Sequence, residues 1–229
     1  MRRALGLAVA AVALTAPAAQ AAKVTTMVVG KSRTLHAPAR VTLEQRTVKV
    51  GGHRCAVGAR TPLATLAALH MTLRLRDYGA CGSRPSAASG LYVKRIGPDA
   101  FSGANGWVYK RNHQAGSVGA GAAKLRGGDR LLWFWCRMQA TGGCQRTLAA
   151  TPERAIAHPG EPLRVTVRGY DDNGHGTPIP GAAVRLGSAG AVTGPDGVAT
   201  VTVPTAGNLR LTATAAGLVP AFPELVRAG

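Results

Sequence analysis

The sequence predicts an α+β domain followed by an all-β sandwich, with the boundary between Ala150 and Thr151. Residues 22–150 hold one helical segment among strand-like segments, whereas residues 151–229 hold only short alternating segments. Charge divides at the same place: residues 22–150 carry 20 Lys+Arg and 4 Asp+Glu, and residues 151–229 carry six of each. With 30 Gly, 14 Pro and 4% aromatic residues, the composition argues against a coiled coil, a helical bundle and a multi-span membrane protein.

Residues 1–21 have the layout of a secretory signal peptide. A basic start at Arg2 and Arg3 precedes an apolar run over 4–16, and Ala19-Gln20-Ala21 is a small-x-small cleavage site. A membrane span needs roughly 20 apolar residues, so we expect cleavage after Ala21 rather than an anchor. No second such run follows. The mature chain is therefore expected to be secreted or associated with a bacterial cell envelope, with no integral membrane segment.

Secondary structure in the N-terminal domain follows from its caps and its periodicity. Thr61 is a favourable N-cap and Pro62 suits the first helical turn, so a helix is predicted over 61–69. Its apolar face would pack on a sheet and consists of Leu63, Leu66 and Leu69. Strands are expected where β-branched and other apolar residues cluster, at 24–29, 41–43, 47–50, 91–96, 106–110 and 131–136.

Four cysteines in an exported chain indicate disulfides, because such bonds persist in oxidising compartments. Cys55, Cys81, Cys136 and Cys144 allow three pairings. We favour Cys55–Cys81 and Cys136–Cys144, because neighbours in sequence close short loops. The rival interpretation is a structural zinc site, but such sites usually use close pairs such as C-x-x-C, which the chain lacks. We therefore expect no metal.

Two motifs in the N-terminal domain resemble a known family. The run 106–112 has the pattern G-W-x-Y-x-x-N, and the run 125–133 has the pattern L-x-x-G-D-x-x-x-W. Together they resemble the transcobalamin-like C-terminal domain family over about residues 24–136. The resemblance implies a β-grasp fold, which that family uses both in corrinoid-binding modules of vitamin carriers and in bacterial surface proteins of unsettled role. It does not decide between those functions.

The C-terminal domain is predicted to be a small β-sandwich. Alternating segments are separated by Gly and Pro at intervals of about ten residues, and they lie at 163–168, 183–186, 197–203 and 209–214. The turn-bearing runs 160–162, 180–184 and 193–199 resemble the bacterial Ig-like repeats of surface proteins. That resemblance implies an Ig-like spacer domain. The Cys pair and buried Trp of antibody domains are absent from these residues.

The aromatic residues of the N-terminal domain have two interpretations. Both faces of the segment 131–136 are apolar, so this strand should be central, with Trp133 and Trp135 in the core. Trp107 and Tyr109 share one face of their strand and are either core residues or a stacking platform for a sugar or a corrinoid edge; we favour core packing and leave the platform open. The loop 110–116 is polar and expected to be exposed, which favours ligand contacts there. The candidate ligand-binding residues are Trp107, Tyr109, Arg111 and His113.

No catalytic residues are predicted. The N-terminal domain has four carboxylates, without a pair placed for acid–base work, and Asp129 is better explained by its turn. A G-x-S-x-G elbow, a histidine pair with metal-ligand spacing and a phosphate-binding P-loop are all absent from the sequence. We therefore expect a protein that is not an enzyme and needs no cofactor.

The positive charge of the N-terminal domain predicts the kind of partner that the protein binds. A balance of +16 over residues 22–150 should attract polyanions, and export makes anionic wall polymers or the envelope surface the expected partner rather than nucleic acid. The predicted function is a non-enzymatic exported protein whose cationic module adsorbs to such polymers. The alternative is a small-ligand module for a corrinoid or a sugar. Because 22 of the 28 basic residues are Arg, GC-rich genome composition also remains an explanation for the charge.

Overall fold

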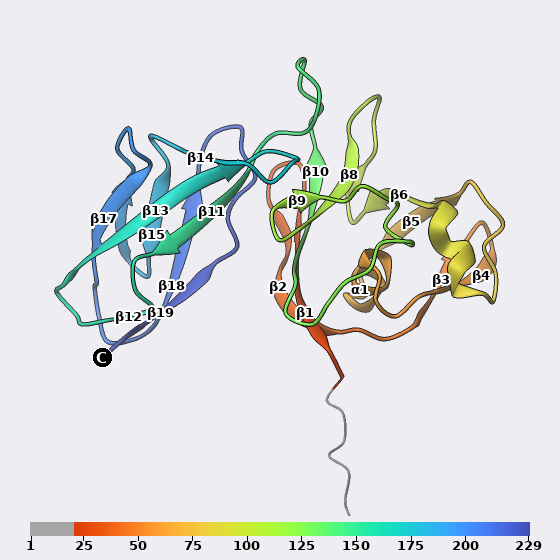
Figure 1. The fold of residues 1–229 in the computed structure, drawn as a ribbon, viewed down its shortest axis with the longest axis horizontal. Coiled ribbons are helices and arrows are strands. Elements are labelled where there is room, and N and C mark those ends of the chain that lie inside the picture. Colours follow the sequence, from red (N-terminus) through yellow and green to blue (C-terminus); the bar gives the residue numbers. More distant parts are fainter. Residues whose placement is uncertain (1–20) are drawn as a thin grey trace, which may run out of the picture.

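A computed structural model describes residues 21–229, and strands make up about half of these residues (Figure 1). The predicted signal peptide, apart from Ala21, lies outside the described residues. The N-terminal half consists of β1 (Lys23–Val29), β2 (Thr34–Thr42), β3 (Arg46–Val50), β4 (His53–Val57), α1 (Pro62–Ala68), β5 (Leu73–Asp77), the 3-10 helix η1 (Pro85–Gly90), β6 (Leu91–Ile96), β7 (Asp99–Ala100), β8 (Gly106–Arg111), β9 (Gln114–Ala115) and β10 (Arg130–Cys136).

One five-stranded sheet organises this half, in the order β2-β1-β10-β8-β9. Its central pair, β1 and β10, is parallel, and the other neighbours are antiparallel. A two-stranded sheet of β3 and β4 and a three-stranded sheet of β5, β6 and β7 lie beside it. The short helix α1 buries Leu63 and Leu66 completely in the core that these elements share.

The C-terminal half is a sandwich of two sheets, as predicted. One sheet has the order β11-β13-β14, with β17 also paired to β13, and the other has the order β12-β19-β18-β15-β16. Alternate residues of these strands point inward and form one core from Leu148 to Ala228. The strands are β11 (Thr147–Pro152), β12 (Ile156–Ala157), β13 (Pro162–Tyr170), β14 (Gly176–Pro178), β15 (Ala183–Leu186), β16 (Ala189–Val192), β17 (Val198–Thr202), β18 (Gly207–Thr214) and β19 (Glu224–Ala228).

The α+β β-grasp domain predicted for the N-terminal half is wrong, because strands dominate both halves. Helix is confined to seven residues in α1 and six in η1. The start of α1 is as predicted, since the Ala64 N–H donates to Thr61 Oγ1 over 3.2 Å. The helix ends early because His70 adopts a left-handed φ of 53° and strand alternation resumes at Leu73. The fold is all-β and sandwich-like, and the C-terminal half consists of two packed sheets.

Strand β10 is central and buried on both faces, which confirms that prediction. Leu131, Trp133 and Trp135 face the core of the N-terminal half. Leu132 and Phe134 face the C-terminal half, where they form a third apolar cluster with Met27, Val29, Cys136, Val219 and Phe222. The two halves are therefore joined through the second face of the main sheet.

Both predicted disulfides are confirmed. Cys55–Cys81 ties β4 to the segment that precedes η1, and Cys136–Cys144 closes the loop between β10 and β11. The expected domain boundary at 150/151 lies within β11, whose residues pair with β13 of the sandwich. Among residues 21–229, no helix has the length and apolar character needed to cross a membrane.

A buried lysine links the two halves. Lys110 on β8 is 1% exposed, and its Nζ donates to the carbonyl oxygens of Tyr170 (3.0 Å) and Asp171 (2.7 Å). It also lies 3.2 Å from Asp172 Oδ1. Burial lowers the pKa of Lys110, and the Asp172 carboxylate opposes that shift. The expectation that the whole 110–116 loop is exposed is thus wrong at Lys110, because the turn after β13 covers it.

Replacing Lys110 should destabilise the protein, because Lys110→Ala removes the cation that pairs with Asp172 and the donor to two carbonyl groups. Asp172 then keeps the Cys144 N–H as its hydrogen-bond donor. We expect the free energy of unfolding in urea to fall by about 2–3 kcal/mol, below the full cost of a broken buried pair because Asp172 is partly exposed. The control is Lys49→Ala, which removes an exposed lysine from β3 and should change stability little. Equal stability losses in the two variants would contradict the importance of this link.

Candidate functional site

Two adjoining cavities lie beside β8. The polar cavity has a volume of about 200 Å³ and the apolar cavity about 240 Å³. Their shared wall consists of Tyr109, Ala115, Gly116 and Val118. The cavities are therefore two compartments of one depression, separated by the Tyr109 ring and the segment that follows β9.

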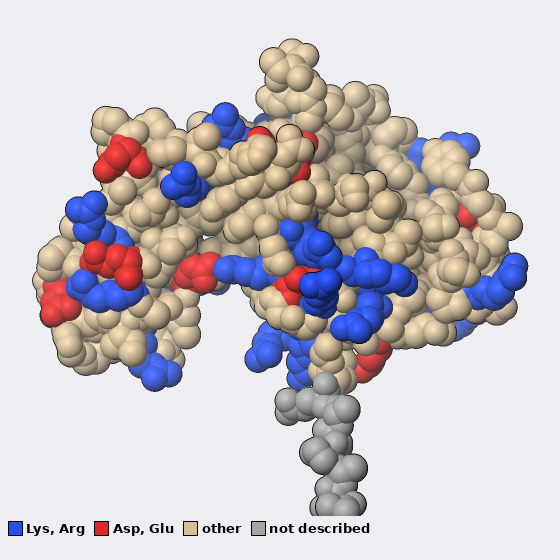
Figure 2. All heavy atoms as spheres, viewed as in Figure 1, with Lys and Arg blue, Asp and Glu red and all other residues tan. Residues whose placement is uncertain are grey.

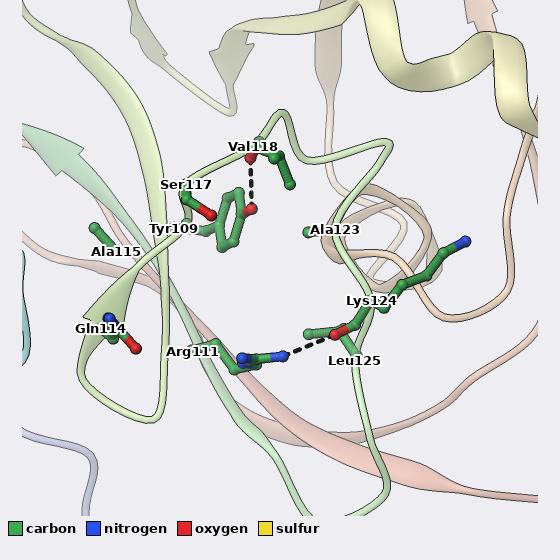
Figure 3. A pocket seen from close by; sticks show the side chains of 10 residues that line it. Tyr109, Arg111, Gln114, Ala115, Ser117, Val118, Ala123, Lys124 and Leu125 are labelled. Carbon is green, nitrogen blue, oxygen red and sulfur yellow. Dashed lines mark hydrogen bonds between the residues drawn. The ribbon is translucent and has the colours of Figure 1, made fainter.

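Tyr109 is held in place by its strand and by the absence of a side chain at residue 116. Its hydroxyl donates to the Val118 carbonyl over 2.7 Å, as Figure 3 shows. Its ring packs at a tilt on Trp133, with 5.5 Å between ring centroids. A Cβ added at Gly116 would lie 2.0 Å from Tyr109 Cζ, so only glycine permits this contact. Burial raises the pKa of Tyr109, so its hydroxyl is a donor at neutral pH.

The polar cavity has a cation at its edge. The Arg111 side chain extends toward the segment 123–125, and its Nη1 donates to the Lys124 carbonyl over 2.8 Å (Figure 3). The Lys124 ammonium group points away from Arg111 in the same view. Ser117 and Gln114 add a hydroxyl and an amide to the lining. This compartment can receive an anion or a hydrogen-bonding group.

The apolar cavity is walled by aromatic and aliphatic side chains. Trp107 and Trp133 line it together with Leu91 and Val93. The Trp107 indole donates to the Asp99 carbonyl over 2.7 Å, and its ring meets Trp135 edge to face with 5.8 Å between centroids. In contrast, the buried Trp133 Nε1 has no hydrogen-bond partner within residues 21–229. This compartment is therefore mostly apolar, although Asp172 also lines it, and the Trp133 N–H is too deeply buried to be a surface of the cavity.

The structure brings three of the four predicted ligand-binding residues to these cavities. Trp107 and Tyr109 are 4% and 7% exposed, so they are core residues whose surfaces also line a cavity. Arg111 lines the polar cavity. Sequence reasoning did not identify Gly116, Val118 or Lys124, because their positions depend on how the segment after β9 folds back over β8.

His113 lies apart from both cavities. It occupies the turn between β8 and β9, where Asn112 and His113 have φ angles of 49° and 77°. Its ring stacks on Tyr170 of the C-terminal half, with 4.1 Å between centroids. Burial lowers the pKa of His113 below its ordinary 6.5, and the nearby charges of Arg130 and Lys110 lower it further. His113 is thus part of the contact between the two halves.

Asp129 organises the segment that carries several cations. Its Oδ2 accepts the Arg126 backbone N–H and its Oδ1 accepts the Asn112 amide, both over 2.8 Å. The same Asn112 accepts the Arg130 backbone N–H through Oδ1. The carboxylate is 8% exposed and is occupied by these bonds, which agrees with the role in a turn expected from sequence.

Six cations gather around this segment and form what we call the basic cluster. Backbone hydrogen bonds bring Lys23 to Gly128 and Arg60 to Leu125, while Arg111 contacts Lys124 directly. Arg130 pairs with Glu224, whereas the other five have no carboxylate within 4.0 Å among the described residues. Figure 2 shows Lys and Arg side chains gathered near the start of β1. The members are Lys23, Arg60, Arg111, Lys124, Arg126 and Arg130.

One group of residues has the composition of a metal site. His53, Cys55 and Cys81 place their ligand atoms within 4.8 Å of one another. Both cysteines are joined in a disulfide, however, and thiolates are the form that binds metal. These three residues are therefore accounted for by the disulfide in the oxidised protein.

The fold defined by these elements is all-β with a C-terminal sandwich of two sheets, and the comparisons with known proteins add little to it. No protein-family model matches the chain, so the resemblance to the transcobalamin-like C-terminal domain family is not supported. No curated protein matches either. The solved structure of the D00-D0 domain of Intimin aligns with 80% of this chain and 92% of that chain, at 14% identity and a TM-score of 0.29. At that TM-score the likeness carries no functional argument.

Gly116→Ala should displace Tyr109, because the new methyl group would overlap the phenol ring. We expect the free energy of unfolding to fall by about 1–3 kcal/mol, the usual cost of overpacking. Gly82→Ala is the matched control, since an added Cβ there meets no atom within 4 Å. Urea unfolding of both variants measures the difference, and a Gly116→Ala protein as stable as the control would contradict the assigned contact.

His113 should make stability depend on pH near neutrality. Because its pKa is lowered in the folded state, the unfolded chain binds the proton first as pH falls below about 6.5, and the free energy of unfolding decreases there. His113→Asn should reduce this slope between pH 6.5 and 5, measured by urea unfolding at several pH values. His70→Asn is the control, because His70 is exposed and also left-handed. A wild-type slope in the His113 variant would contradict the prediction.

Proposed function

We propose that this chain is an extracellular, non-enzymatic binding protein that adsorbs to anionic polymers of the cell envelope through its basic cluster. The two disulfides support an extracellular or envelope location. The observation that carries the proposal is the arrangement of charge: five cations of the cluster lack a carboxylate partner among the described residues and are exposed on one region of the N-terminal half. Such a region attracts a polyanion and releases its counterions.

The carboxylates of the N-terminal half support a non-enzymatic role. Asp129 is engaged in the hydrogen bonds described above, and Asp77 accepts the backbone N–H groups of Gly79 and Cys81. Asp99 accepts the Lys31 N–H, and Glu44 pairs with Arg46. Each carboxylate therefore has a structural contact, and none faces another as an acid–base pair would.

A small-ligand role is the second candidate, and the cavities beside β8 favour it. Three of the residues expected to bind a ligand line them. Compartments of about 200 and 240 Å³ are too small to enclose a corrinoid, so the site suits a smaller molecule. In this second candidate function, the C-terminal sandwich serves as a spacer domain.

Polymer adsorption can be tested with two triple variants that have the same net charge. Arg60→Gln, Lys124→Gln and Arg126→Gln together remove three charges from the basic cluster, and Arg164→Gln, Arg185→Gln and Arg210→Gln remove three exposed charges from the sandwich. On immobilised inorganic polyphosphate and on isolated wall polymer, the cluster variant should elute at clearly lower salt, with a slope of log affinity against log salt reduced by about two to three.

The sandwich variant should elute close to the unmodified protein. Equal elution of both variants would show that net charge alone sets retention, as genome composition would predict. Retention that does not change with salt would also contradict adsorption through charge, because screening weakens such contacts beyond a Debye length of about 8–10 Å.

A further inference from the structure

Strand β8 places aromatic surface and a cation along one line. Trp107, Tyr109 and Arg111 are spaced by two residues, so they share a face of the strand and follow one another at about 6.7 Å. Trp107 and Tyr109 line the apolar cavity, while Tyr109 and Arg111 line the polar cavity. A ligand that lies along β8 therefore meets aromatic rings at one end and a guanidinium group at the other.

One donor at this site has capacity left. The Arg111 guanidinium makes one hydrogen bond, from Nη1 to the Lys124 carbonyl, within residues 21–229, so its remaining N–H groups can bind an anion. The indole N–H of Trp133 is buried without a partner in the same residues, but it has almost no accessible surface, so a ligand in the cavity does not reach it. The site thus calls for an anionic group at Arg111.

The size of the compartments limits the apolar group to one ring. A cavity of 150 Å³ is known to hold benzene, so about 240 Å³ accommodates a single substituted ring. The walls supplied by Trp107, Tyr109 and Trp133 favour a flat aromatic group over a branched one. A ligand that occupies both compartments runs past the edge of the Tyr109 ring, where the hydroxyl bonds Val118.

We infer that the paired cavities bind a small aromatic carboxylate. The ring occupies the apolar cavity, and the carboxylate lies against Arg111 in the polar cavity. The inference rests on the small-ligand role proposed above. The site shares Arg111 with the basic cluster, but it does not require polymer adsorption. It needs no covalent step and no cofactor.

The test uses 3-phenylpropionate as the probe and two analogues that each lack one feature. Its amide lacks the anion, and propionate lacks the ring. Titration of the ¹⁵N-labelled protein by NMR should give the tightest binding for the probe, with each analogue at least fivefold weaker. The probe should also shift the indole N–H signal of Trp107, which lines the apolar cavity and which a Trp107→Phe variant identifies.

Variants separate a specific site from general attraction to positive charge. Arg111→Gln should abolish the preference for the acid over its amide, and Arg111→Lys should restore part of it. A double variant, Arg60→Gln with Arg126→Gln, changes two members of the basic cluster that line neither cavity. It should bind the probe as the unmodified protein does, even where it elutes from polyphosphate at lower salt.

Three results would overturn the inference: propionate binding as tightly as the probe, an unchanged preference in Arg111→Gln, or no saturable binding of the probe up to 10 mM, about the weakest affinity expected of a one-ring ligand. If the unmodified protein does not bind the probe but is still retained on polyphosphate, the result overturns this ligand site and does not contradict polymer adsorption.

Discussion

Burial of strand β10 on both faces is the constraint on which the rest of the structure depends. Leu131, Trp133 and Trp135 complete the core of the N-terminal half, and Leu132 and Phe134 require a second cover, which the C-terminal half supplies through Val219 and Phe222. A sheet with one apolar face needs one covering layer, whereas a sheet with two apolar faces needs a layer on each side. The two halves therefore pack against each other because of the sequence of a single strand.

Strand β8 pairs with β10 in the same sheet, so it also has the N-terminal core on one side and the sandwich on the other. Its residues alternate, so Trp107, Tyr109 and Arg111 line the cavities while Lys110 faces the sandwich. Val108 packs on the third apolar cluster and also lines the apolar cavity. The contacts of Lys110 and His113 with the turn after β13 then hold the hairpin of β8 and β9 in position. Through the same hairpin, Asn112 bonds Asp129 and fixes the segment that carries the basic cluster. Packing between the halves thus supports both candidate surfaces.

Local signals in the sequence predicted the elements well and their assembly less well. The Thr61 cap, the central position of the 131–136 strand and both disulfides followed from residue chemistry over short distances. The prediction of an α+β fold was wrong because the periodicity at 61–69 identifies one helix but not its share of the whole N-terminal half. That helix has only seven residues. The burial of Lys110 was not predictable, because a lysine beside a polar loop is normally expected to be exposed. Its burial depends on the turn at 170–172, which is distant in sequence and covers it. The cavities depend on Gly116 for the same reason: nothing nearby in sequence indicates that Tyr109 will lie on it.

The most direct measurement of a binding surface on the N-terminal half is NMR mapping of backbone amides during titration with long-chain polyphosphate. Adsorption through the basic cluster predicts that the largest shifts fall at Lys23, Arg60, Arg111 and the segment 124–130, with the sandwich strands unaffected. Shifts of equal size across the strands from β13 to β19, or none at saturating polymer, would contradict it.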